Sequence, residues 1–307
     1  MKKMNLRMVW IGGGLLAGVL APSVGWACAC GCGVFDVGTS SMFPTGEGGM
    51  AFLNYAYQDQ NRNWSGTSRA PAANNDDKDI ETHFVTFGFQ YMFNRSWGAQ
   101  VEAPYDFRYF KSEDGARRWN QLGDIRLRGI YTGFLADLSA GVTLGVKLPT
   151  GDFKFDPDVV DRDTQIGTGS TDILLGGFYR GNLDKNQRWD WFAQMELDVP
   201  VLIQDQYRPG LELDAAAGID YKGLSLGRVR VSPVAQVIFS ERTSDSGANS
   251  AHPVASGYQR IMLSPGVEFH VHPVKIYADA EFPVYQNFTG NQLAASVLFK
   301  FSVSWMF

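Results

Sequence analysis

The three cysteines of this chain stand at alternate positions in the segment Cys28-Ala-Cys30-Gly-Cys32. Thiolates are soft ligands that suit Cu(I), zinc or another soft metal, and glycine leaves the backbone free to bring neighbouring sulfurs together. In an oxidising compartment the same thiols have a competing fate, a disulfide, although alternate residues are awkwardly spaced for one. The cluster therefore predicts either a soft-metal site or a labile redox pair.

Two histidines, His270 and His272, are also alternate in sequence. A strand places alternate side chains on one face, and the alternation of the C-terminal segment puts Met306 on the inner face at the same end. If residues 28–32 fold to this end, sulfur and imidazole groups meet there, which makes the two histidines candidate helpers of a metal site. A solvated or capping histidine pair explains the same spacing without a metal.

Ionisable side chains recur at every second position of many segments. Isolated charges are costly to bury in hydrocarbon, so this face must be solvated or mutually paired. Two interpretations stay open: a water-filled pore whose transverse field orients polar solutes, and a salt-bridged interior that only holds a narrow barrel together. The candidate pore-lining residues are Glu102, Asp106, Arg108, Asp124, Arg126, Arg128, Lys147, Glu196, Asp198, Arg228, Arg230, Glu268, Asp279 and Glu281.

The elements that would hold these residues are strands, and the segment 292–307 shows this best. Its period of two indicates a β-strand between lipid and a wet interior. One face carries Leu293, Ala295, Val297, Phe299, Phe301, Val303, Trp305 and Phe307. The other face carries Gln292, Ala294, Ser296, Leu298, Lys300, Ser302, Ser304 and Met306.

About twelve such segments predict an all-β fold, a transmembrane antiparallel β-barrel. They run over 50–60, 82–94, 97–110, 122–134, 138–150, 171–182, 189–203, 211–222, 227–240, 259–272, 274–288 and 292–307. Short turns alternate with longer polar loops, which predicts short periplasmic turns, external loops and periplasmic termini. Aromatic residues near the short-turn ends predict an interfacial girdle of Trp97, Tyr131, Trp191, Tyr221 and Trp305.

The N-terminal residues 1–27 have the pattern of a signal peptide. Lys2 and Lys3 precede an apolar stretch over 8–20, which is too short to span a bilayer as a helix. We expect cleavage after Ala27, then a Cys/Gly-rich periplasmic segment or plug over 28–49, then the barrel over 50–307. Lipidation of Cys28 is the alternative, although Trp26 fits a lipoprotein signal poorly.

Composition and motifs argue against two function classes. The net charge is −5 with no basic run, which disfavours a nucleic-acid partner. No Gly-x-Ser-x-Gly motif accompanies His83 or His252, so an enzyme is not expected.

The segments Lys147-Leu-Pro-Thr-Gly-Asp152 and Gly167-Thr-Gly-Ser-Thr-Asp172 resemble a paired signature of outer-membrane transporters of the phenol meta-pathway (MetA-like) family. The resemblance implies a barrel over 50–307 that passes small, often aromatic, molecules. The final Phe307 is similar to the C-terminal aromatic that the assembly machinery reads in many bacterial outer-membrane proteins. From the residues themselves, the prolines and glycines favour a strand-loop-strand geometry and do not specify a phenolic substrate.

These observations together predict a passive channel for small solutes in the outer membrane of a Gram-negative cell, and the resemblance implies aromatic or organic ones. The lipid bilayer and the outer-membrane assembly machinery are the expected partners. One alternative is a barrel that binds a soft metal such as copper through its three cysteines. A second alternative is a closed structural or partner-binding barrel.

Overall fold

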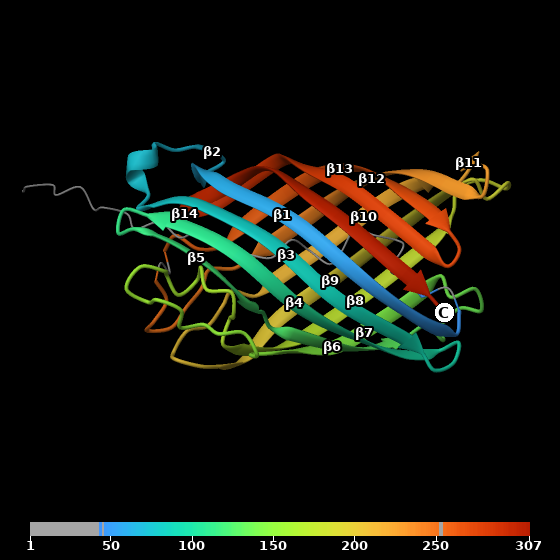
Figure 1. Ribbon diagram of the computed structural model, residues 1–307, viewed down its shortest axis with the longest axis horizontal. Coiled ribbons are helices and arrows are strands. Elements are labelled where there is room, and N and C mark those ends of the chain that lie inside the picture. The colour runs from blue at the N-terminus through green and yellow to red at the C-terminus, as the bar shows by residue number, and fades with distance from the viewer. Residues whose placement is uncertain (1–42, 45, 252–253) are drawn as a thin grey trace, which may run out of the picture.

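An antiparallel β-sheet that closes on itself accounts for most of the chain in the computed structural model, which describes residues 43, 44, 46–251 and 254–307 (Figure 1). The wall consists of β1 (Gly48–Gly66), β3 (Asp77–Met92), β4 (Trp97–Ser112), β6 (Ile125–Tyr131), β7 (Ala140–Leu148), β8 (Ser170–Asn182), β9 (Trp189–Ile203), β10 (Glu212–Tyr221), β12 (Val229–Arg242), β13 (Tyr258–Val271) and β14 (Val274–Met306). Outside it lie β2 (Ser68–Arg69), β5 (Ala116–Leu122), β11 (Leu224–Leu226) and one 3₁₀ turn (Ala72–Asn74). Within the described residues, no helix has the length and apolarity to cross a membrane.

Strand β14 crosses the wall twice, although its extended backbone is continuous. It pairs antiparallel with β13 over 274–288 and with β1 over 288–306. Directions alternate in a closed ring of antiparallel neighbours, so the number of crossings must be even. Eleven strands close this ring, and β14 therefore reverses once, close to Gly290, whose positive φ of 71° suits glycine. The wall has twelve crossings, which confirms the predicted all-β barrel.

The two ends of the barrel differ in their connections. Short turns at 93–96, 183–188 and 272–273 lie at the end where β1 begins and the chain finishes, on the right in Figure 1. There Gly49 and Phe307 exchange two backbone hydrogen bonds of 2.8 and 2.9 Å. The longer connections, such as 149–169 and 243–257, lie at the opposite end. Outer-membrane barrels have this asymmetry, with the short turns facing the periplasm.

The outer surface is apolar along the wall, as the alternation predicts. Phe87, Phe89 and Leu144 are exposed there by 59, 43 and 63 %. Near the short-turn end, Trp97 packs on Tyr131 with ring centroids 4.6 Å apart. The alternate side chains point into the barrel, where many polar and charged groups are buried. This surface fits a lipid environment, with an interfacial aromatic girdle at its periplasmic edge.

Three expectations about single segments were wrong. Residues 111–121, which separate the predicted strands 97–110 and 122–134 and were expected to form a polar loop, instead include β5, which folds back to pair with β4 beyond the point where β6 leaves that strand. Leu293 and Ala295 are buried rather than lipid-facing, since register shifts opposite Gln60 break the alternation of β14. Arg228 lies in the turn between β11 and β12, outside the lumen, because the wall strand begins only at Val229.

Inward-pointing aromatic rings lie against glycines of the neighbouring strand. Phe178 stands directly opposite Gly141, and Phe192 opposite Gly218. A Cβ atom added at Gly141 or Gly218 would lie 2.4 or 2.6 Å from the facing ring. Because the glycines have no side chain, each ring can lie flat over the neighbouring strand on the inner wall. This arrangement is known as aromatic rescue of glycine.

Candidate functional site

The loop over 149–169, between β7 and β8, folds into the external end of the barrel and is fixed at its neck by Asp124. One carboxylate oxygen of Asp124 accepts the Gly151 amide at 3.0 Å, and the other accepts the Thr168 amide at 2.9 Å and the Thr168 hydroxyl at 2.5 Å. At this neck Gly151 and Gly167 approach so closely that a Cβ on Gly167 would lie 2.3 Å from the Gly151 carbonyl oxygen. The paired glycine-containing segments noted in the sequence therefore form the neck of a loop.

A second anchor comes from Arg108, which is 3 % exposed. Its Nε donates to the Thr82 hydroxyl at 3.0 Å, and its Nη1 donates to the Thr164 carbonyl at 2.6 Å. The loop residues Val160 and Ile166 also belong to an apolar cluster with side chains that point into the barrel. The wall strands contribute Ile80, Phe110 and Leu293 to this cluster, and β5 contributes Trp119. The hydrogen bonds of Asp124 and Arg108, together with this apolar packing, hold the loop inside the lumen.

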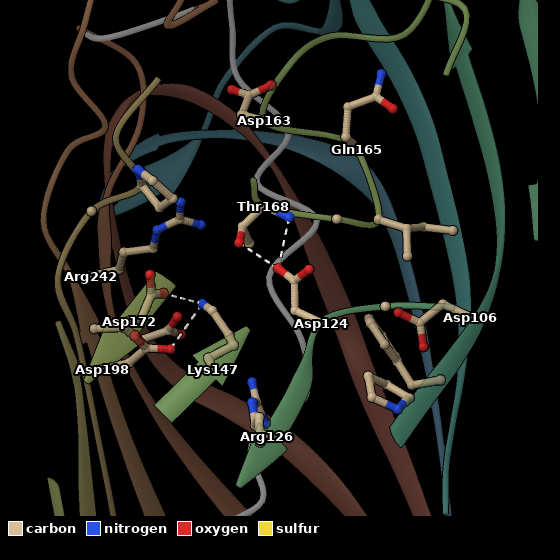
Figure 2. Close-up of a pocket in the computed structure, with 18 of the residues that line it drawn as sticks. Asp106, Asp124, Arg126, Lys147, Asp163, Gln165, Thr168, Asp172, Asp198 and Arg242 are labelled. Atoms are coloured by element: carbon tan, nitrogen blue, oxygen red, sulfur yellow. Dashed lines mark hydrogen bonds and ion pairs between the residues drawn. The ribbon is translucent and has the colours of Figure 1, made fainter. Parts of the chain in front are cut away.

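A small polar cavity of about 150 Å³ lies beneath the loop (Figure 2). Lys147 projects into it from β7, and its ammonium group forms ion pairs with Asp172 and, at 3.0 Å, with Asp198. Figure 2 shows Lys147 directed at both carboxylates and Asp124 directed at Thr168. A cation on β7 thus bridges carboxylates on β8 and β9, and the ammonium and the two carboxylates form one ion-pair cluster at the cavity wall.

Below this cavity, Arg128 connects two carboxylates of other strands. Its Nη1 donates to Glu102 on β4 at 2.5 Å, while Nε and Nη2 donate to the two oxygens of Glu196 on β9 at 2.8 and 2.9 Å. The Arg128 side chain is 4 % exposed. A bidentate contact of this kind fixes the planar guanidinium in orientation as well as in position. The cluster borders both the cavity under the loop and a smaller one of about 90 Å³ on its periplasmic side.

Phe43 and Pro44, which precede β1, lie inside the lumen on the periplasmic side of Arg128. The Phe43 ring stacks on Phe178, with centroids 4.6 Å apart and planes inclined by 10°, and meets Phe192 edge-on at 6.2 Å. Arg180 donates to the Pro44 carbonyl at 2.9 Å. These two residues line both the 90 Å³ cavity and a wider one of about 590 Å³ at the periplasmic mouth.

The periplasmic mouth contains His270 and His272 among several charged groups. His270 stands directly between Arg230 and Lys275 of the neighbouring strands. A cationic setting opposes a metal cation at this histidine. Among the described residues there is no group of three His, Cys, Asp or Glu that could hold a metal ion.

A further anchor at the external end is Asp245, in the loop after β12. It accepts hydrogen bonds from the Tyr207 hydroxyl at 2.8 Å, the Gly210 amide at 2.7 Å and Arg242 at 2.7 Å. Burial, and then the charge of Asp245, raises the pKa of Tyr207 well above its ordinary value, so this phenol stays protonated and can donate. The adjacent guanidinium of Arg162 lies 4.2 Å from the Tyr207 ring centroid.

The structure brings most of the predicted lining residues to the lumen. Those that line the cavity under the loop are Glu102, Asp106, Arg108, Asp124, Arg126, Lys147 and Asp198. Arg128 and Glu196 line the next cavity, and Arg230 and Glu268 the mouth. Asp279 and Glu281 border none of these three cavities. They are buried in side-chain contacts, with Asp279 accepting from Ser264 at 2.8 Å and Glu281 lying 3.4 Å from Lys300.

Sequence reasoning missed the aromatic layer of the lumen. Phe178 and Phe192 share the inward phase of Arg180 and Glu196, so the alternation that located the charges also locates these rings. Cys28, Cys30 and Cys32, the signal peptide over 1–27 and most of the segment 28–49 lie outside the described residues. The cysteine hypothesis therefore stays a prediction.

No protein-family profile and no curated protein matches the chain. Among solved structures, the COG4313 outer membrane channel from Pseudomonas putida F1 superposes with a TM-score of 0.64 over 86 % of this chain and 96 % of that one, at 11 % identity. The β-domain of the Bordetella autotransporter BrkA superposes with a TM-score of 0.53 over 85 % and 100 %, at 14 % identity. At such identities the likeness shows the fold, which is that of outer-membrane β-barrels. It does not test the phenol meta-pathway resemblance.

Proposed function

We propose that the protein is a passive channel for small solutes in the outer membrane of a Gram-negative cell. One observation carries this proposal: a closed barrel with an apolar outer belt encloses ionisable side chains of both signs and a series of cavities. An interior that served only to fill a narrow barrel would not require three cavities along its axis. Twelve crossings also enclose more space than the eight that side chains alone can fill.

The lumen favours small solutes. Its cavities decrease from about 590 Å³ at the periplasmic mouth to about 90 and 150 Å³ towards the external loop. The ion-paired cations Lys147 and Arg128, with their carboxylate partners, line the constriction with polar groups that can orient a polar solute. The resemblance to the phenol meta-pathway family favours organic, often aromatic, solutes within this size range.

The position of Phe307 supports assembly in the outer membrane. Its backbone is paired with that of Gly49, and its ring lies 5.9 Å from that of Phe89 on the outer wall. A C-terminal aromatic at the barrel seam is the form in which the assembly machinery would read it. We propose that this machinery and the lipid bilayer are the partners of the barrel.

Single-channel recording of the refolded full chain in planar bilayers tests the proposal. We expect discrete, voltage-independent current steps and permeation of small sugars or alcohols into liposomes that contain the protein. A barrel that shows its heat-modifiable gel shift, and so is folded, but passes neither ions nor solutes would overturn the channel. That outcome would favour a closed structural barrel.

A further inference from the structure

The Phe43 ring occupies a slot built by other parts of the chain. Phe178 covers one face of the ring, Phe192 meets its edge, and Val234 and Tyr277 complete the buried cluster. Phe43 is only 6 % exposed. Its polar tether is the hydrogen bond from Arg180 to the Pro44 carbonyl. A ring thus lies in the lumen as a bound ligand would, although it belongs to the chain itself.

The walls of this slot do not depend on Phe43. Phe178 and Phe192 are seated on Gly141 and Gly218 by strand register, which is fixed by the barrel hydrogen bonds. Their ring planes therefore remain along the wall when the slot is vacated. What remains is a flat, apolar gap that suits one planar ring, since offset or parallel stacking is favoured between aromatic groups.

A polar group beside the slot points to a ligand with a hydrogen-bond donor. Gln236 is 4 % exposed and stands directly opposite Gly218, on the other side from Phe192. Its amide nitrogen lies 3.0 Å from the Tyr277 hydroxyl and 3.1 Å from Asp279. Its carbonyl oxygen is buried and has no hydrogen-bond partner among the described residues. A buried acceptor left unpaired is costly, and a hydroxyl or amine on a bound ring would satisfy it.

We propose that this slot, formed by Phe178, Phe192, Val234 and Tyr277 with Gln236 beside Tyr277, binds a small planar ring carrying a hydroxyl or amino group, and that Phe43 is its internal competitor. The inference rests on the proposed function and adds the solute class and the means by which the lumen is closed. With Phe43 seated, the mouth cavity and the cavity under Arg128 are separate. An arriving ring displaces Phe43 towards the mouth, and the two cavities then join.

The connection to β1 allows this displacement. A Cβ on Gly46 would meet nothing within 4 Å, and Gly48 has a φ of 120°, which glycine adopts without strain. The mouth cavity of about 590 Å³ can receive the displaced phenyl group. The backbone at Gly46 and Gly48 can therefore act as a hinge, and the mouth cavity can accommodate the displaced Phe43 side chain.

Equilibrium binding to the folded full-length protein in detergent tests the proposal, with benzyl alcohol and cyclohexylmethanol as probes. If Phe43 occupies the slot about nine-tenths of the time, its removal raises the apparent affinity about tenfold, because apparent affinity scales with the fraction of open sites. We therefore expect Phe43→Ala to bind benzyl alcohol about tenfold more tightly than the wild type and to prefer it over cyclohexylmethanol. The double variant Phe43→Ala/Phe178→Ala should lose this preference, and Phe93→Ala, an exposed outer-wall phenylalanine, should behave as the wild type.

Equal benzyl alcohol affinity in the wild type and Phe43→Ala, or equal binding of the two alcohols by Phe43→Ala, would overturn the inference. If Phe43→Ala fails its heat-modifiability check, Phe43→Leu provides the comparison with a smaller, non-aromatic side chain that cannot stack on Phe178. Binding is measured without transport, so a failure of the channel proposal is seen separately, as absent currents in every variant. Selective ring binding with equal currents in the wild type and Phe43→Ala would refute the closing role of Phe43.

Discussion

Arg128 and Glu196 meet fork to fork inside the barrel, with Nε and Nη2 of the arginine 2.8 and 2.9 Å from the two carboxylate oxygens. The two residues belong to β6 and β9, which are separated in the wall by β7 and β8. Their contact therefore extends over two intervening strands. It makes Arg128 the central cation of the constriction, because Glu102 accepts from the same guanidinium.

Replacing Arg128 with alanine should lower the stability of the barrel and widen the constriction. Glu102 and Glu196 would lose their shared counter-ion, and breaking a buried pair in this way costs about 3 kcal/mol of stability. We expect a larger single-channel conductance and a shift of ion selectivity towards cations. Reversal potentials in a salt gradient measure the shift. Arg118→Ala removes the same charge from an exposed side chain near the external end and should leave selectivity unchanged.

Asp124→Asn should release the inward loop. The amide replaces one acceptor oxygen by a donor that faces the amides of Gly151 or Thr168, and losing such charge-assisted bonds costs about 2 kcal/mol. Trypsin should then cut faster after Lys154, whose exposed side chain lies in this loop. Asp158→Asn, at an exposed position of the same loop, is the matched control. Identical cleavage rates in all three proteins would contradict a clamping role for Asp124.

The glycine neck gives a steric prediction. Gly167→Ala would place its Cβ 2.3 Å from the Gly151 carbonyl oxygen, against backbone that cannot turn aside. Such overpacking costs about 1–3 kcal/mol, so the folded form should lose its gel shift at a lower temperature. At Gly129 the nearest atom to an added Cβ is 3.7 Å away, and Gly129→Ala should keep the wild-type transition. A shift of equal size in both variants would argue against the clash.

The turn over 183–188 predicts a pH dependence. Backbone amides of Trp189, Arg188 and Asn186 donate to the Asp184 carboxylate, and the first of these contributes most to lowering its pKa below the ordinary 3.8. A pKa that is lower in the folded state contributes stability above the unfolded value, and this contribution is lost as pH falls through the folded value. Asp184→Asn should therefore lower the heat stability of the barrel at pH 7, and the difference should vanish in strong acid. Lys185→Ala in the same turn should show no such pH-dependent difference.

The alternation of side chains predicted the strands of the wall correctly, and it assigns inner-facing positions to most of the predicted residues that border the cavities. Lys147 and Asp198, for example, follow from a period of two alone, because this period fixes the face on which a side chain lies. It does not fix the partner of that side chain. Only the three-dimensional structure therefore shows that Asp124 and Arg108 anchor the loop, whereas Arg128 connects carboxylates across the lumen.

The errors arose where period two does not hold. The inward loop has no period, so nothing in the spacing of Val160 and Ile166 shows that they enter the barrel. A register shift changes the face of every residue beyond it, so an uninterrupted alternation wrongly places Leu293 on the lipid side. Arg228 continues the alternation of β12 by sequence alone, although its backbone has already turned into the β11–β12 hairpin.

The close approach of Gly151 and Gly167 also bears on how such a barrel can diversify. Both ends of the loop are held at one point, so the residues between them can change in length or sequence without altering the hydrogen-bond register of β7 and β8. Doubling the length of a flexible loop costs only about 0.6 kcal/mol in closure entropy. Natural variation, or a designed graft, can therefore replace residues 152–166 as one unit. The solutes that the barrel admits would change, while the strands of the wall would keep their register.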